Sequence, residues 1–329
     1  MVRNATLTFA SAIAALAILA MSAAGDASAQ DWPSRPIRMI VPYPPAGGTD
    51  IVARTLNEKL APTLNATIIV DNKGGAAGNL GTDLAAKAAP DGYTVLFTLS
   101  SHTINPKLFP NLPFDAEKDF AAVSLAAMIP QILVAHPSVP ANNVQELIAY
   151  AKANPGKLNF ASVGIGSPGH VAGELFKLRT GTRMVHVPYK GGGPAVIDTM
   201  GGQVQLLFVS MPAAWQHVKS GKLKALGVTS DKRSVAAPDV PTIGEQGVSD
   251  YAVNSWYGVF VPAKTPPAVI AKLNAAMASA LQSPETKEKL LSQGAEAVSS
   301  TPAEFEALVR DELKKWEYVI REAKITPEG

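Results

Sequence analysis

Short runs of β-branched and aromatic residues recur along this chain, and most are followed by a glycine-rich turn and then by an amphipathic stretch. A strand, a turn and a helix repeated in this order predict a parallel sheet with crossover helices, and therefore an α/β fold. The expected strands are Ile37–Val41, Thr67–Val70, Tyr93–Thr98, Ile132–Ala135, Leu158–Ser162, Met184–Val187, Val204–Val209 and Lys224–Thr229. The expected helices are residues 49–63, 78–88, 143–153, 169–180, 194–200 and 212–219.

The pattern changes after residue 250. Tyr251–Val261 is expected to form one long strand, and Trp256 within it is a candidate for the wall of a binding pocket. Helices are expected to follow this strand. Thr301 and Glu304 have the spacing of a capping box, which predicts a last helix that begins there and ends near Lys324.

The first 29 residues have the features of an export signal. Arg3 supplies a positive start, Leu7 to Met21 are apolar, and Ala27-Ser28-Ala29 gives the small-residue pattern that a signal peptidase cuts. An apolar run of about 15 residues is shorter than the ~20 that a membrane-spanning helix needs. We therefore expect an exported protein that begins at Gln30 after cleavage.

The length of the remaining chain predicts two lobes. About 300 residues of strand–helix units exceed what one hydrophobic core usually holds. The least regular connections are Asp119–Pro130 and Asp231–Tyr251, so we expect the chain to cross between lobes twice. This places residues 30–127 with 251–329 in the first lobe and residues 128–250 in an inserted second lobe.

Composition and motifs argue against several functions. Lys plus Arg number 29 against 27 Asp plus Glu, which leaves no basic excess for nucleic acid. No cysteine is present, and the five histidines lack metal-site spacing. The run Gly164–Gly169 matches G-x-G-x-x-G but lacks the acidic residue that a nucleotide ribose needs about 20 positions later. Ser167 does not lie in a G-x-S-x-G elbow, so hydrolase chemistry is not favoured and no cofactor is expected.

Glycine-rich or polar turns follow the expected strands in both lobes. In the open sheets of α/β proteins, ligands bind at this carboxyl edge. The helix N-termini there carry unpaired N–H groups and about half a positive charge each, which favours an anion. Each single turn could instead serve the fold alone, because strand-to-helix turns need small residues. The turns are Pro42–Asp50, Asp71–Asn79, Leu99–Pro106, Gly164–His170, Pro188–Pro194 and Ser210–Pro212.

Several blocks of the sequence together resemble one family, the Bug-type substrate-binding proteins, which are the extracytoplasmic receptors of tripartite tricarboxylate transporters. The similarity extends over essentially the whole chain after the signal. The blocks are Trp32–Ile37, Val41–Tyr43 with Gly47–Asp50, Asp71–Lys73, Gly78–Gly81, Pro90–Thr94, Val187–Gly191, Asp239–Thr242 and Gly258–Ala263.

The resemblance implies a type II periplasmic-binding-protein fold, in which two hinged lobes close on a ligand. It further implies a non-enzymatic, monomeric receptor in the periplasm that binds a small carboxylate and delivers it to membrane transporter subunits. A ligand-sensing module for a signalling receptor is the alternative, and an enzyme is a third possibility.

The ligand-binding residues implied by the resemblance come from both lobes. In two places the sequence departs from the family pattern: Gly74 replaces a common proline, and Ser100-Ser101-His102 replaces smaller residues. The identity of the carboxylate therefore cannot be carried over. The implied residues are Tyr43, Ala46, Gly47, Gly48, Thr49, Asp50, Ser100, Ser101, His102, Gly166, Ser167, His170, Tyr189, Lys190 and Ser210.

Overall fold

A computed structural model describes residues 32–327, so the expected signal peptide and its cleavage site before Gln30 lie outside the described residues. The strands are β1 (Ile37–Val41), β2 (Ile68–Asn72), β3 (Thr94–Leu99), β4 (Phe120–Ala135), β5 (Asn159–Ser162), β6 (Val185–Pro188), β7 (Leu206–Ser210), β8 (Lys224–Val228), β9 (Asn254–Pro262) and β10 (Glu296–Ala297). The helices are α3 (Gly48–Leu64), η1 (Ala76–Gly78), α4 (Asn79–Ala86), α5 (Ser101–Leu108), α6 (Val144–Ala153), α7 (Pro168–Thr180), α8 (Gly192–Met200), α9 (Met211–Lys219), α10 (Pro267–Gln282), α11 (Pro284–Ser292) and α12 (Pro302–Glu322).

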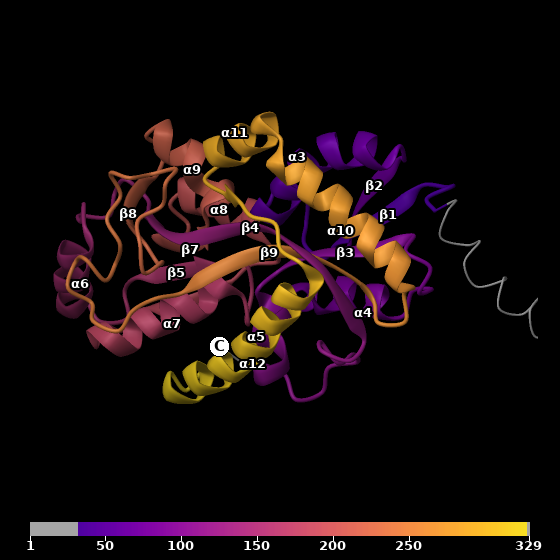
Figure 1. The fold of residues 1–329 in the computed structure, drawn as a ribbon. Coiled ribbons are helices and arrows are strands. Elements are labelled where there is room, and N and C mark those ends of the chain that lie inside the picture. Colours follow the sequence, from indigo (N-terminus) through magenta and orange to yellow (C-terminus); the bar gives the residue numbers. More distant parts are fainter. Residues whose placement is uncertain (1–31, 328–329) are drawn as a thin grey trace, which may run out of the picture.

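The strands form two parallel groups that an antiparallel pair joins. Strands β2, β1 and β3 are parallel to one another, and so are β7, β5 and β6. Between the groups lie β9 and β4, which give the order β2-β1-β3-β9-β4-β7-β5-β6, while β8 and β10 also pair with β4. Figure 1 shows β4 and β9 running through the middle of the molecule, with one parallel group on each side. The fold is therefore two α/β lobes connected by a shared pair of strands.

Each expected strand overlaps an observed one, and β1 matches its expected range from end to end. Two local expectations were wrong. The segment Asp119–Pro130 was expected to be an irregular link, but from Phe120 onwards it is the first part of β4, a strand of 16 residues. Its backbone pairs with β9 as far as Pro130, and from Gln131 onwards β4 pairs with β7. This pairing compensates for a run rich in alanine, which has little intrinsic preference for a strand.

The second local error concerns the turn after β3. Leu99–Pro106 was expected to be a polar turn, but the chain enters helix α5 at Ser101. Within this helix Ile104 and Leu108 are buried in the core of the second lobe, beside residues such as Phe160. Burial of this apolar face, which the serine-rich start of the segment does not reveal, accounts for the helix.

The C-terminal helix α12 packs on both lobes. Its first half, with Phe305, joins a cluster that includes Ile40 and Phe260 of the first lobe. Further along, Trp316 joins the cluster that contains Phe160 of the second lobe. In Figure 1, α12 passes beside α5 and extends towards α7. Within residues 32–327 no helix combines the length and apolar character needed to cross a membrane.

A buried carboxylate fixes α12 at its midpoint. Glu312 is 7% exposed, and its Oε2 accepts hydrogen bonds from the indole nitrogens of Trp256 (3.0 Å) and Trp316 (3.1 Å). The Oγ1 of Thr103 lies 3.0 Å from the same oxygen. Trp256, which the sequence analysis considered for a pocket wall, is therefore a core residue, packed edge-on against Phe305.

Replacing Glu312 by alanine should lower the free energy of unfolding by about 3 kcal/mol, because two buried indole N–H groups lose their acceptor. Urea denaturation followed by tryptophan fluorescence measures this loss. The control is Glu306→Ala on the exposed face of α12, where Glu306 pairs only with Arg310, and we expect a change below about 1 kcal/mol. Equal losses in both variants would contradict the assigned role of Glu312.

Candidate functional site

A small enclosed cavity, here called the inner cavity, lies between the two lobes. Its volume is about 20 Å³, enough for roughly one water molecule. Both lobes contribute to its wall, and so do the connecting strands β4 and β9. The lining residues are Tyr43, Gly47, Gly48, Thr49, Leu99, Gln131, Val163, Pro168, Gly192, Ser210, Ser255 and Tyr257.

Four helices begin at the inner cavity. Gly48, Pro168 and Gly192 are the first residues of α3, α7 and α8, and Ser210 immediately precedes α9. The first N–H groups of a helix have no partner inside it, and the helix dipole places partial positive charge there. Among residues 32–327, the lining includes no charged side chain. The positive potential at this cavity therefore comes from the main chain.

The loop before α3 is held in shape by Asp50. The carboxylate of Asp50 accepts hydrogen bonds from the N–H of Ala46 (3.0 Å), from Arg54 Nε (2.9 Å) and from Asn72 Nδ2 (3.0 Å). Burial by itself would raise the pKa of Asp50, but these hydrogen bonds outweigh burial and lower it. Ala46 adopts a left-handed conformation with φ of 63°. We infer that Asp50 and Ala46 shape the loop rather than contact a ligand.

Hydroxyl groups connect the wall of the inner cavity across the lobes. The Tyr43 hydroxyl, from the first lobe, contacts Ser101 Oγ and donates to the carbonyl of Ala77 at 3.2 Å. Tyr257, on β9, donates to Ser210 Oγ at 3.0 Å. Burial raises the pKa of Tyr257 to about 12, so its hydroxyl keeps its proton at neutral pH. Because Ser210 Oγ accepts from Tyr257, the Ser210 hydroxyl keeps its own proton to donate to an anion.

The two lobes touch along the rim of this cavity. A Cβ atom added to Gly48 would lie 2.2 Å from Ser210 Oγ and 2.6 Å from the Tyr257 hydroxyl. At Gly47 the nearest atom to an added Cβ is the nitrogen of Gly192, at 3.6 Å. A side chain is therefore excluded at Gly48 but not at Gly47, and the lobes are closed on each other.

The structure brings only some of the predicted residues to the inner cavity. Ser100 and Ser101 do not line the cavity, but each is hydrogen-bonded to a residue that does. Ser100 bonds to Ser255 at 2.9 Å, and Ser101 bonds to Tyr43. The predicted residues that line the cavity directly are Tyr43, Gly47, Gly48, Thr49 and Ser210.

Gly166, Ser167 and His170 build the turn that begins α7. Ser167 Oγ caps the helix by accepting from the N–H of His170, and the N–H of Gly166 donates to His170 Nδ1, both at 3.2 Å. The His170 ring stacks on His186 at 4.1 Å. Burial, with a smaller effect of Lys177, lowers the pKa of His170 to about 4. The His170 ring is therefore uncharged at neutral pH.

His102 lies away from the inner cavity. Its ring is buried between Phe120 and Phe260, at centroid distances of 5.0 and 4.4 Å. Its Nε2 lies 3.0 Å from the carbonyl oxygen of Ala116, and burial lowers its pKa to about 4. The structure therefore places this side chain in the aromatic core.

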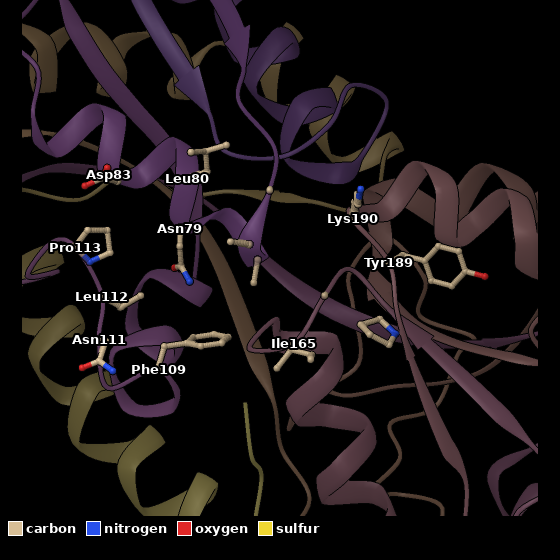
Figure 2. A pocket seen from close by; sticks show the side chains of 15 residues that line it. Asn79, Leu80, Asp83, Phe109, Asn111, Leu112, Pro113, Ile165, Tyr189 and Lys190 are labelled. Carbon is tan, nitrogen blue, oxygen red and sulfur yellow. The ribbon is translucent and has the colours of Figure 1, made fainter. Parts of the chain in front are cut away.

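Tyr189 and Lys190 line a different cavity, here called the outer cavity, which has a volume of about 570 Å³. The Tyr189 hydroxyl donates to Asp198 of α8 at 2.8 Å. In Figure 2 this hydroxyl points away from Ile165, which lies on the wall of the same cavity.

The sequence analysis missed Gln131, Ser255 and Tyr257. Successive side chains of a strand point to opposite faces, so Ser255 and Tyr257 face the cavity while Trp256 faces the core. Gln131 could have been noticed as a polar residue at the start of an apolar run. In the described part of the chain, no three His, Cys, Asp or Glu side chains gather in a way that could hold a metal ion.

Comparisons with known proteins identify the relatives of this chain. Residues 52–325 match the model of the tripartite tricarboxylate transporter family receptor. Protein BugT of Bordetella pertussis is 40% identical over 313 residues, covering 94% of this chain and 96% of BugT. The solved periplasmic binding protein BugD is 35% identical with a TM-score of 0.87, covering 90% of this chain and 99% of BugD. An R. palustris protein solved with adipate is 33% identical with a TM-score of 0.88, with coverage of 90% and 99%. The chain therefore belongs to the tripartite tricarboxylate transporter receptor family and has its two-lobed, type II periplasmic-binding-protein fold.

Proposed function

We propose that this protein is a periplasmic solute receptor that binds a small carboxylate in the inner cavity and delivers it to the membrane subunits of a tripartite tricarboxylate-type transporter. The observation that carries this proposal is the meeting of four helix N-termini at a cavity without a charged side chain. Such a site favours an anion through its N–H groups and hydroxyls, and among residues 32–327 its lining has no carboxylate to balance the charge of a cation.

The energetics of such a site are favourable for a carboxylate. A hydrogen bond to a charged group contributes roughly 1.5–3 kcal/mol, so three or four of them offset the loss of water around the anion. A hydroxyl donor adds to the main-chain N–H groups: Ser210 lines the cavity, and its oxygen accepts from Tyr257, which leaves the Ser210 proton for the ligand. The family and the adipate in one relative also support a carboxylate ligand.

Ligand binding requires the lobes to move. In this closed arrangement the inner cavity holds about one water molecule, so an organic acid is bound only with the lobes further apart than they are here. Strands β4 and β9 connect the lobes and are the natural hinge. In this proposal residues 30–127 with 251–329 move as one lobe and residues 128–250 as the other. The ligand shifts the equilibrium towards a form closed around it, less closed than this one, only by its higher affinity for that form.

The inner cavity also supports binding without catalysis. Ser210 is its candidate nucleophile, but the group bonded to Ser210 Oγ is the neutral hydroxyl of Tyr257. A serine nucleophile needs an adjacent base, and no His, Lys, Asp or Glu lines this cavity among residues 32–327. We therefore propose a receptor rather than an enzyme.

A panel of carboxylic acids and the amides of the same acids tests the preference for an anion. At about 100 times its dissociation constant, a bound carboxylate should raise the melting temperature by about 5 °C. The matched amide should give no shift, because it lacks the charge that the helix N-termini favour. Differential scanning fluorimetry measures both, and equal shifts from acid and amide would rule out anion recognition.

The glycine pair before α3 tests the location of the site. Gly48→Ala should abolish the carboxylate-induced shift, because the new methyl group meets Ser210 and Tyr257 when the lobes close. Gly47→Ala is the matched control and should keep the shift, since Gly47 has φ of −83° and an added Cβ would meet its nearest atoms at 3.6 Å, an ordinary van der Waals contact. Without ligand both variants should unfold cooperatively, with Gly48→Ala melting below the wild-type temperature because of the contact with Tyr257, so each carboxylate-induced shift is measured from the variant's own ligand-free melting temperature. Full binding by Gly48→Ala would place the ligand elsewhere.

A further inference from the structure

The turn that joins strand β5 to helix α7 is built around two glycines. Gly164 has φ of 128° and Gly166 has φ of 81°, and other residues rarely adopt such conformations. The same turn brings Val163 and Pro168 to the wall of the inner cavity. Glycine loses more conformational freedom on folding than any other residue, so the surroundings of this turn must hold its shape.

His186 holds the first of these glycines through a serine. Ser162 Oγ donates to the carbonyl of Gly164 and accepts from the N–H of Gly164, both at 3.1 Å. His186 Nε2, from the neighbouring strand β6, lies 2.7 Å from the same oxygen. Because the serine proton is directed at the carbonyl, His186 Nε2 carries the ring proton and donates it to Ser162 Oγ. His186 therefore orients the serine that bonds both backbone groups of Gly164.

His170 holds the second glycine directly. The N–H of Gly166 donates to His170 Nδ1 at 3.2 Å, so this nitrogen keeps its lone pair and the ring proton of neutral His170 is on Nε2. The rings of His170 and His186 stack with 4.1 Å between their centroids, and Phe160 stacks on His186 at 4.9 Å. Two neutral imidazoles in contact with each other thus hold both glycines of the turn.

The surroundings of the histidine pair oppose a positive charge on either ring. His170 Nε2 and His186 Nδ1 are buried and have no hydrogen-bond partner among the described residues. Helix α7 packs on β4, β5, β6 and β7, and His186 is the one ionisable side chain that these four strands contain. On α7 itself, Lys177 pairs with Glu174 at 2.7 Å. Tyr251, which also packs on α7, donates to a carbonyl of this helix at 2.9 Å. No described carboxylate is therefore left to balance a charged ring.

Protonation would break the bonds that hold the turn. A proton on His170 Nδ1 removes the acceptor of the Gly166 N–H and sets two N–H groups against each other. Burial, with a smaller effect of Lys177, lowers the pKa of His170 to about 4. Burial, and then His170 and Lys177, lower the pKa of His186 to about 3. Both values lie below the ordinary 6.5, so the neutral rings stabilise the turn above pH 6.5, and this stabilisation is lost as the pH falls towards 4 and 3.

We propose that His170 and His186 are positioning residues, which as a neutral pair hold the turn between β5 and α7 in the shape that forms the second-lobe wall of the inner cavity. Neither ring lines this cavity, so the pair acts through Gly164 and Gly166. Acid that protonates the pair loosens the turn. The consequence for ligand binding rests on the proposed function, whereas the hold on the turn does not.

Hydrogen exchange of the ligand-free protein, followed by mass spectrometry, measures the hold on the turn. His186→Ala and His170→Ala should each speed exchange of residues 163–168 about tenfold at neutral pH, because a hydrogen bond to the turn is lost. His186→Gln and His170→Asn should exchange as slowly as wild type, since a Gln amide can donate to Ser162 and an Asn oxygen can accept from Gly166. Slow exchange in the alanine variants, or fast exchange in all four variants, would overturn the proposal.

Acid gives a readout that loss of packing does not. The double variant His170→Asn/His186→Gln has no ring to protonate, so the ratio of wild-type to double-variant exchange at each pH cancels the intrinsic pH dependence of exchange. For residues 163–168 this ratio should rise about tenfold or more between pH 6.5 and 4.5. His102→Gln is the matched control, because His102 is equally buried with a pKa lowered to about 4 but lies in the first lobe, and it should keep the rise. A constant ratio, or a rise that His102→Gln abolishes, would contradict the proposal.

A thermal-shift experiment tests the consequence for ligand binding. With a mixture of adipate, malate and citrate at pH 7, His186→Ala should lose most of the ligand-induced shift that wild type shows, and His186→Gln should keep it. A full shift in His186→Ala would show that the inner cavity does not need the pair, and the positioning role would fail. If wild type itself shows no shift while the exchange results stand, the proposed function fails and the hold of the pair on the turn is upheld.

Discussion

The N-terminal ends of four helices, each with partial positive charge, meet where the two lobes are in contact. The sheets and connecting strands hold these helix ends in place. Helices α3, α7, α8 and α9 begin around one cavity, each after a strand of a parallel group. Without an anion between them, the partial positive charges of these helix ends would repel one another. The closed arrangement is therefore suited to a negative ligand, and the main chain supplies the counter-charge that a basic side chain supplies in many other sites.

The connecting elements explain how this arrangement can open and close. Strands β4 and β9 pair over most of their length and join the two parallel groups, so a small change in their twist moves one lobe relative to the other. Helix α12 crosses the same region and is fixed by Glu312 to Trp256 on β9. Apolar cores on both sides keep each lobe rigid. In the proposed opening, the lobes separate at the contact surface that contains the inner and outer cavities.

Periodicity and turn composition predicted most of the fold, because they report local preferences directly. They could not reveal the first part of β4, whose alanine-rich run is a strand only through pairing with β9. For the site, the sequence identified the two glycines at the start of α3. It could not show that a side chain is excluded at Gly48 but not at Gly47, because the atoms that exclude it belong to Ser210 and Tyr257, which are distant in sequence. His102 follows a strand as binding residues do, yet its side chain turns into an aromatic core. Such long-range contacts carry no local signal.

The central claim is that main-chain N–H groups and neutral hydroxyls of the inner cavity hold the carboxylate. A crystal structure of the complex with a carboxylate found by thermal shift tests it most directly. We expect the carboxylate oxygens to lie within hydrogen-bond distance of N–H groups at the starts of α3, α8 or α9, or one water molecule away from them. A carboxylate held instead by Lys190, or by any other lysine or arginine side chain, would contradict the account.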